Sequence, residues 1–265
     1  MKKSVGFLVF LFVMSVATLS CGPVFAQKEL KDLVLPDGST SRFYVAMPTG
    51  EGPHPAILIL HGTGGLVPMN LELADAFARA GFVAVAACWF AGNHLPSDFK
   101  PPSTLPCPKG PRFDGANFQT AQVGAALLAF MRQLAGVDPE RIGLWGHSRG
   151  GTVALLLAAM GEKVRGVVAA APIYSYPKRS GKYPDEFPVR HLERIKVPVL
   201  MQQGTADEII PIAEAREFEG KAKAAGLAIE ASYYEGMDHA GFYFGRFRNA
   251  TRQRAIEFFA KTLQK

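Results

Sequence analysis

Continuous apolar runs that alternate with helical stretches constrain the fold of this chain more than any other feature. The runs lie at residues 56–60, 82–87, 141–145, 167–171, 199–203 and 229–234. Stretches with helical spacing of apolar residues lie at 71–80, 118–134, 149–160, 213–225 and 251–263. Strands that are apolar along their whole length are typical of a parallel sheet covered by helices on both faces. The pattern predicts a doubly wound α/β domain.

The start of the sheet is expected to differ from the rest. Residues 31–35 and 42–47 look like two strands joined through Pro36-Asp37-Gly38, which has the turn chemistry of a hairpin. The sheet is therefore predicted to begin antiparallel and to continue mostly parallel. Since no repeat or shift in composition marks a second core, one catalytic domain is expected over residues 27–265.

The first 26 residues are typical of a signal peptide. Lys2 and Lys3 precede an apolar run, and small residues lead to Ala26. We predict cleavage after Ala26 and export to the periplasm or the medium, with no stable membrane insertion afterwards. Lipid attachment at Cys21 is the less favoured alternative, because residues 18–20 lack the leucine that usually lies three positions upstream.

Charge argues against nucleic acid as a partner. The formal net charge is +6 and falls to +4 when Lys2 and Lys3 leave with the signal peptide. The remaining basic residues are scattered and alternate with acids along the expected helices, whereas a nucleic-acid binder concentrates them in a stripe. A small-molecule ester is the expected partner, and the sequence leaves the oligomeric state open.

Signal removal would leave two cysteines, Cys88 and Cys107, which flank a proline-rich segment. In an oxidising compartment they could form a disulfide. The alternative is a buried thiol at Cys88 and a free one at Cys107, because sequence alone does not show whether their Cα atoms approach. The sequence leaves both readings open.

The pentapeptide Gly146-His147-Ser148-Arg149-Gly150 is a G-x-S-x-G motif between a predicted strand and a predicted helix. A serine in such a sharp turn sits in strained backbone, and the flanking glycines avoid collisions with neighbouring elements. The motif predicts Ser148 as a nucleophile. A chance match is the alternative, and the strand-to-helix context disfavours it.

A serine nucleophile needs a base and a carboxylate that orients it. His239 follows the last predicted strand on a glycine-flanked loop, and Asp207 follows the strand at 199–203. The order Ser148, Asp207, His239 is the chain order of α/β-hydrolases. Glu208 and Asp238 remain rivals for the acid.

The oxyanion of the reaction is expected to rest on the backbone N–H groups of Thr63 and Arg149, with Gly64 as the alternative to Thr63. Thr63 lies in the glycine-rich run at 61–65, which could also be a plain turn. That run fits neither nucleotide fingerprint, no Cys-x-x-Cys occurs, and no histidine pair has helical ligand spacing. Neither cofactor nor metal is expected.

Aromatic residues mark the two long irregular segments, 89–116 and 172–196, which follow strand ends. Trp89 and Tyr174 are the residues predicted to line a substrate pocket, with Phe90 and Tyr176 beside them. Ordinary packing of these aromatics is an equal alternative.

From about Leu33 to Leu263 the chain resembles the dienelactone hydrolase family of the α/β-hydrolase superfamily. The motifs that carry the resemblance are HGTGG at 61–65, VDPERIG at 137–143, GHSRGG at 146–151, VPVL at 197–200, GTAD at 204–207 and GMDH at 236–239. It implies an α/β-hydrolase fold and the roles given above for Ser148, Asp207 and His239. The family's namesake members use a cysteine nucleophile, so Ser148 does not bring the dienelactone substrate with it.

The leading hypothesis is therefore a serine hydrolase that cleaves a carboxylic ester or lactone through an acyl-enzyme on Ser148. A peptidase or thioesterase would use the same three residues. A non-catalytic binding protein on a hydrolase scaffold is the alternative from another class, since fold alone does not give function. The natural substrate and its acyl chain length do not follow from the sequence.

Overall fold

The computed structural model describes residues 29–36, 38, 40–90, 105, 107, 117–174 and 187–264. The signal peptide predicted at 1–26, with Cys21, lies outside the described residues, as does Tyr176. Eight strands form one sheet: β1 Lys31–Val34, β2 Thr40–Ala46, β3 His54–Leu60, β4 Val83–Ala87, β5 Val137–His147, β6 Gly166–Ala170, β7 Val199–Gly204 and β8 Ile229–Tyr234.

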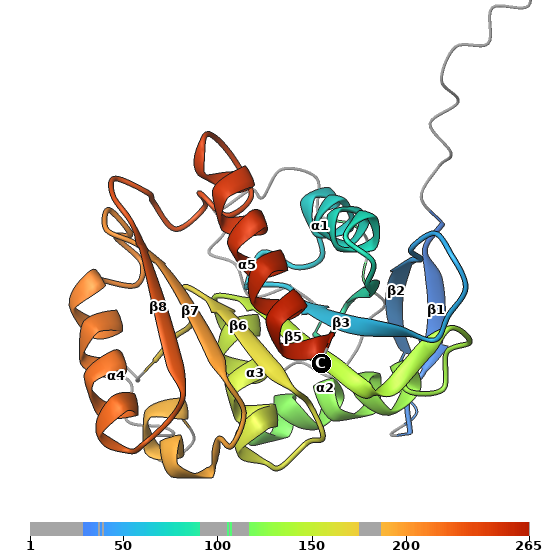
Figure 1. Ribbon diagram of the computed structural model, residues 1–265, viewed down its shortest axis with the longest axis horizontal. Coiled ribbons are helices and arrows are strands. Elements are labelled where there is room, and N and C mark those ends of the chain that lie inside the picture. The colour runs from blue at the N-terminus through green and yellow to red at the C-terminus, as the bar shows by residue number, and fades with distance from the viewer. Residues whose placement is uncertain are drawn as a thin grey trace, which may run out of the picture.

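The strand order is β1-β2-β4-β3-β5-β6-β7-β8 (Figure 1). β1 pairs antiparallel with β2, and β2 pairs antiparallel with β4. All later pairs, from β3 with β4 to β7 with β8, are parallel. The predicted mixed sheet with an antiparallel start is confirmed, and the carboxyl ends of β5, β7 and β8 consequently meet at one edge.

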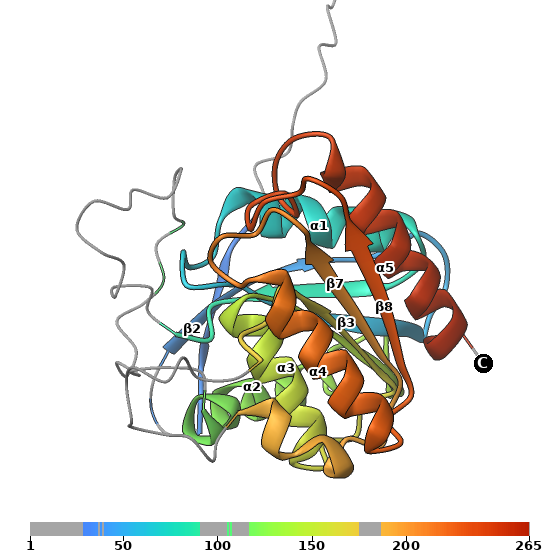
Figure 2. The same cartoon turned by 90° about the vertical axis from the view of Figure 1, so that its left-hand side faces the viewer.

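In the described part of the chain, five α-helices cover the sheet: α1 Pro68–Arg79, α2 Phe118–Met131, α3 Arg149–Ala159, α4 Ile212–Ala224 and α5 Phe247–Leu263. Figure 2 shows α1 and α5 on one face and α2, α3 and α4 on the other. Side chains of β3 alternate between the two cores because successive strand residues point to opposite faces. Ile57 and Ile59 pack in the α1/α5 layer, whereas Leu58 and Leu60 pack in the α2/α3/α4 layer.

Two details differ from the sequence-based expectation. β5 begins at Val137, four residues before the strand predicted at 141–145, so Asp138-Pro139 lies within the strand. Val137 pairs with His54, and a register shift between His54 and Ala56 accommodates the extra residues. The segment at 172–196, predicted to be irregular, contains two short 3-10 helices, Pro188–Arg190 and Leu192–Arg194.

Within the described residues, no helix combines the length and the apolar character needed to cross a membrane.

Candidate active site

Ser148 occupies a sharp turn between β5 and α3. Its φ of 53° lies in the left-handed region, which costs a non-glycine residue free energy and is typical of functional turns. The turn is fixed on both sides, because the Ser148 N–H donates to the Ala170 carbonyl (2.8 Å) and its own carbonyl accepts from the Thr152 N–H (3.1 Å). The backbone therefore presents this one side chain at the carboxyl edge of the sheet.

The two glycines of the motif are required by close backbone contacts. A Cβ atom on Gly146 would lie 2.2 Å from the Gly150 carbonyl oxygen, and a Cβ on Gly150 would lie 2.1 Å from the Leu60 carbonyl oxygen. Both distances are far below van der Waals contact. Helix α3 thus starts directly against β5 and β3, with Ser148 at the point of contact.

Asp207 and His239 meet on the neighbouring loops. Asp207 follows β7, His239 follows β8, and His239 Nδ1 donates to Asp207 Oδ2 at 2.8 Å. The Asp207 side chain is fully buried, whereas His239 keeps 14% of its side-chain surface exposed. The rivals Glu208 and Asp238 are exposed. The structure therefore pairs His239 with the predicted carboxylate.

The loops that carry these two residues are joined through their backbones. The Ala206 N–H donates to the Met237 carbonyl (3.1 Å), and the Gly236 N–H donates to Thr205 Oγ1 (2.9 Å). Gly204 allows the approach, because a Cβ there would lie 2.1 Å from the Met237 carbonyl oxygen. The loops that carry Asp207 and His239 are thus held together by these contacts as one unit.

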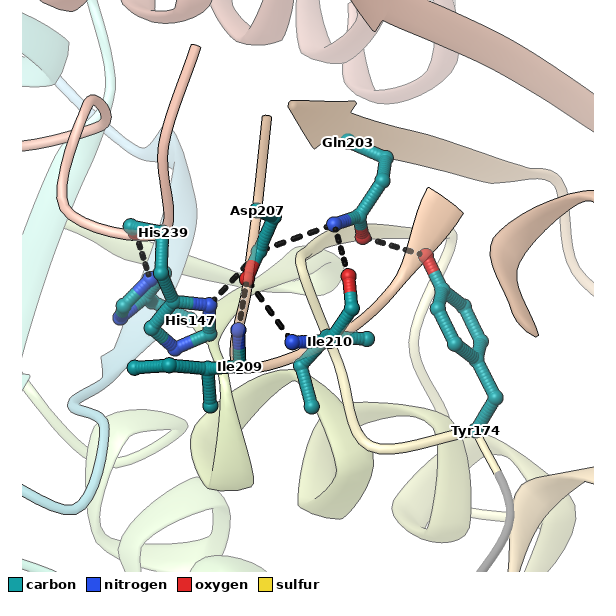
Figure 3. Close-up of polar contacts among 7 residues, drawn as sticks. All are labelled: His147, Tyr174, Gln203, Asp207, Ile209, Ile210 and His239. Carbon is teal, nitrogen blue, oxygen red and sulfur yellow. Dashed lines mark hydrogen bonds and ion pairs between the residues drawn. The ribbon is translucent and has the colours of Figure 1, made fainter. Parts of the chain in front are cut away.

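His147 connects that unit to the nucleophile turn. Its Nε2 donates to the His239 carbonyl oxygen at 3.0 Å, and the two imidazole rings lie 4.7 Å apart, centroid to centroid (Figure 3). His147 directly precedes Ser148. The contact places His239 beside the turn that carries the serine.

The glycine loop, residues 61–65, packs against the same turn. A Cβ on Gly62 would lie 2.9 Å from His147 Nδ1 and 3.2 Å from Ser148 Cβ, so the absence of a side chain at Gly62 lets the loop come this close. His61 Nδ1 donates to the Gly62 carbonyl (2.8 Å), and Trp89 Nε1 donates to the His61 carbonyl (2.9 Å). The half-buried Thr63 follows Gly62, and Arg149 opens helix α3 on the other side of the serine.

A disulfide joins Cys88, at the end of β4, to Cys107, with their Cα atoms 5.9 Å apart. Leu105, two residues before Cys107, donates its N–H to the Leu66 carbonyl at 2.8 Å. The disulfide and this hydrogen bond thus hold Leu105 and Cys107 next to the glycine loop. The sequence left the state of these cysteines open.

One group of three side chains among the described residues has the spacing of metal ligands. The ligand atoms of His61, Cys88 and Cys107 lie within 4.8 Å of one another. Both sulfurs are used by the disulfide, and a thioether-like disulfide sulfur is a poor substitute for the thiolate that binds soft metals. The arrangement in this oxidised form does not suit a metal.

Trp89 and Tyr174, predicted to line the substrate pocket, are 2% and 1% exposed. The Trp89 indole N–H donates to the His61 carbonyl in the glycine loop. Tyr174 packs on Phe218, and its hydroxyl donates a hydrogen bond to Gln203 Oε1 (3.0 Å). Side chains so deeply buried and bonded to protein groups have no surface left for a substrate. The structure supports the packing alternative for both residues.

Burial and hydrogen bonding set the charge states of the site. Burial acts to raise the pKa of Asp207, but the bond from His239, the charge of His239 and the amides of Ile210 and Ile209 hold that pKa below its ordinary value. Burial, followed by the nearby charge of His239, lowers the pKa of His147 to about 3. Asp207 is therefore anionic and His147 neutral at physiological pH.

Sequence reasoning missed the residues that hold Asp207 and His239 in place. Gln203 donates to Asp207 Oδ2 at 2.9 Å, and His147 binds the His239 backbone. A signal for Gln203 was present, because Gln202-Gln203 ends a strand that is otherwise apolar. Two consecutive buried amides need partners, and such partners gather at sites.

Comparisons with known proteins agree with the family that the sequence motifs indicate. The family model described as "Dienelactone hydrolase family" matches residues 42–264. Protein usf of Aquifex pyrophilus is 25% identical over 77% of this chain and 83% of its own length. A protein of Aquifex aeolicus named for carboxymethylenebutenolidase is 26% identical over the same shares.

Solved structures agree in fold. A Klebsiella pneumoniae structure named for dienelactone hydrolase has a TM-score of 0.71 at 21% identity, covering 88% of this chain and 98% of that one. The thermophilic esterase Est2 of Thermogutta terrifontis has a TM-score of 0.68 at 22% identity, covering 88% and 92%. Both confirm the predicted α/β-hydrolase fold. With the family model spanning most of its length, the chain belongs to the dienelactone hydrolase family and is a hydrolase of the carboxylic-ester class.

Proposed function

We propose that Ser148, His239 and Asp207 form a catalytic triad that hydrolyses a carboxylic ester or lactone through an acyl-enzyme. One observation carries the proposal: His147, which precedes Ser148 at φ 53°, is bonded to the backbone of His239, and His239 Nδ1 is bonded at 2.8 Å to a fully buried carboxylate. Asp207 accepts a hydrogen bond from Nδ1–H, which keeps the proton on Nδ1, so the neutral imidazole has its lone pair on Nε2. That nitrogen is the base the serine needs.

In the first half-reaction, Ser148 Oγ attacks the ester carbonyl carbon and gives its proton to His239 Nε2. The negative charge that develops on the carbonyl oxygen is stabilised by the backbone N–H groups of Thr63 and Arg149. Two observations support this: Gly62 touches the serine, and Arg149 begins a helix whose N-terminus favours negative charge. The C–O bond breaks, and the alcohol leaves with the proton from His239.

In the second half-reaction, His239 removes a proton from water, which attacks the acyl carbon on Ser148. The acid leaves and the proton returns to Ser148 Oγ, so that atoms and charge balance without a cofactor. A lactone follows the same steps, except that its alcohol and acid remain in one product. The Thermogutta terrifontis esterase, a fold relative, has been solved phosphorylated by paraoxon, which supports a search for ester substrates here.

The test is a kinetic panel on the purified chain: p-nitrophenyl esters of rising acyl length, a lactone, a thioester and a dipeptide amide. We expect turnover of an ester or lactone, with a burst of p-nitrophenol equal to the enzyme concentration where deacylation is slow. Ser148→Ala should lower kcat by at least about 10⁴-fold. Turnover of the amide or thioester alone would replace the ester proposal with the corresponding activity.

We also propose that the chain is exported and cleaved after Ala26. The disulfide between Cys88 and Cys107 supports this, because disulfides persist in oxidising compartments. N-terminal sequencing of the secreted form should begin at Gln27. A lipid-modified N-terminus at Cys21 would instead favour an anchored protein.

A further inference from the structure

Strand β7 carries two adjacent buried glutamines directly before its last residue, Gly204, and their side chains lie on opposite faces of the sheet. Gln202 and Gln203 are both 0% exposed, and successive strand residues point to opposite sides. Gln202 Nε2 donates to Tyr234 Oη (2.7 Å) and to the Thr251 carbonyl (3.0 Å), on the α5 side. Gln203 donates to Asp207. One strand thus offers a glutamine at the site and a matched glutamine away from it.

The orientation of the Gln203 amide is fixed by three partners (Figure 3). Its Nε2 donates to Asp207 Oδ2 at 2.9 Å and to the Ile210 carbonyl at 3.0 Å, and both of these groups only accept. Its Oε1 accepts from the Tyr174 hydroxyl at 3.0 Å. A flipped amide would set its oxygen against two acceptors, so Tyr174 and Ile210 together hold the donor toward the carboxylate.

Asp207 receives a full set of donors. Oδ1 accepts from the Ile209 and Ile210 N–H groups at 2.9 and 2.8 Å. Oδ2 accepts from Gln203 Nε2 and from His239 Nδ1 at 2.9 and 2.8 Å. A carboxylate offers about four lone-pair sites, so every one is used. These four hydrogen bonds fix the orientation of the carboxylate. They thereby fix the position of the oxygen that accepts from His239.

We propose that Gln203 is a positioning residue for the triad, and that Tyr174 acts through Gln203 by fixing its amide. This inference rests on the proposed function, since it assigns Asp207 and His239 their roles. Gln203 shares Asp207 Oδ2 with His239, so it fixes the oxygen to which the imidazole is bonded. Because Gln203 and Tyr174 are buried, neither has surface for a substrate. Their loss should therefore act on kcat and leave KM close to its original value.

The first experiment compares Gln203→Leu with Gln202→Leu in the full mature chain, using p-nitrophenyl butyrate. Each variant loses a buried amide from the same strand, and only the first loses a bond to Asp207. We expect Gln203→Leu to lower kcat about ten- to hundredfold, the range for a hydrogen bond to a charged group. Gln202→Leu should keep kcat within about twofold. Thermal unfolding checks that both variants fold, and Gln203→Met replaces the leucine variant if that one does not.

The pH profile of kcat/KM separates positioning from a general loss of stability. Without the Gln203 donor, the Asp207 carboxylate loses one of the hydrogen bonds that stabilise its charge and becomes more basic. The acid limb should consequently move to higher pH in Gln203→Leu and stay in place in Gln202→Leu. An acid limb that stays in place in both variants, or a kcat for Gln203→Leu within twofold of that for Gln202→Leu, would overturn the proposal.

Tyr174→Phe tests the outer part of the chain of hydrogen bonds. It removes only the hydroxyl, so the expected loss of kcat is smaller, about threefold. In a Gln203→Leu background the same change should have no further effect, because Tyr174 acts through that amide. Independent, multiplying losses would remove Tyr174 from the proposal. If His239→Ala retains wild-type activity, the triad itself fails, and that outcome is distinct from failure of Gln203 alone.

Discussion

The nucleophile turn and the acid–histidine loops hold their residues by different means. Ser148 is placed chiefly through the backbone: a left-handed φ, hydrogen bonds of its N–H and carbonyl groups, and two glycines in close contact with carbonyl oxygens. Asp207 and His239 are placed by hydrogen bonds: Asp207 accepts from the Ile209 and Ile210 N–H groups and from the Gln203 amide, and the His239 carbonyl accepts from the His147 imidazole. The comparison teaches that one half of the site is set by steric fit and the other by a hydrogen-bond network. The two halves should therefore fail in different ways.

The largest effect is expected from Asp207→Asn, which reverses the network without changing its shape. The Ile209 and Ile210 amides need an acceptor, so the new amide oxygen takes the Oδ1 position and its NH₂ group faces His239. The imidazole must then accept at Nδ1 and carry its proton on Nε2, where it is no base. We expect kcat to fall about 10³- to 10⁴-fold, as for such changes in serine protease triads. Ester kinetics beside a thermal melt would show this, and a loss below tenfold would argue against the triad.

The next largest effect is expected from Gly150→Ala in the nucleophile turn. The new Cβ would lie 2.1 Å from the Leu60 carbonyl oxygen, which is backbone and cannot move aside cheaply. We expect a loss of about 4 kcal/mol or more in the free energy of unfolding. Gly220→Ala in helix α4 is the control, since nothing lies within 4 Å of its Cβ and alanine is the better helix former. Equal urea midpoints for the two variants would contradict the steric account.

A smaller effect is expected from removing the disulfide beside the glycine loop. Cys88→Ala with Cys107→Ala opens a loop with a sequence separation of 19, which corresponds to about 3 kcal/mol in the chain-entropy estimate. Urea unfolding of the double variant should match that of the reduced wild type. Added reductant should leave the double variant unchanged. A wild-type midpoint that does not respond to reduction would contradict a stabilising bridge.

The smallest expected effect is the change in the free energy of unfolding per pH unit. Burial lowers the pKa of His61 to about 4 and that of His147 to about 3, whereas both titrate near 6.5 when unfolded. The unfolded chain binds more protons below pH 6.5, so stability is full above that value and falls as the pH drops toward 4. Each histidine contributes up to about 1.4 kcal/mol per pH unit.

His147→Gln checks the sign of this dependence. The amide can still donate to the His239 carbonyl but does not titrate, so urea unfolding between pH 7 and 4 should show a shallower loss of stability than the wild type. The same slope in both proteins would mean that His147 is not held neutral.

Sequence predicted the sterically fixed half better than the networked half. Glycines at 146 and 150 around Ser148 indicate the turn directly, because backbone contacts at both positions leave no room for a Cβ atom. Asp207 and His239 could be chosen from strand ends and chain order. The two adjacent amides at 202 and 203 signal buried polar partners, but the contact between Gln203 and Tyr174 could not be predicted, because it depends on the packing of residues 29 positions apart. For the same reason, Trp89 and Tyr174 could be proposed as pocket residues although tertiary packing buries them.

The measurement that tests the central claim most directly is labelling by a fluorophosphonate, read by intact mass. An activated serine attacks phosphorus and displaces fluoride, so the wild type should gain one phosphonyl group per chain. Ser148→Ala should gain none, and His239→Ala should react far more slowly because the base is gone. A folded wild type that stays unmodified, or a Ser148→Ala variant that is modified to the same extent, would contradict the assignment of Ser148 as the nucleophile.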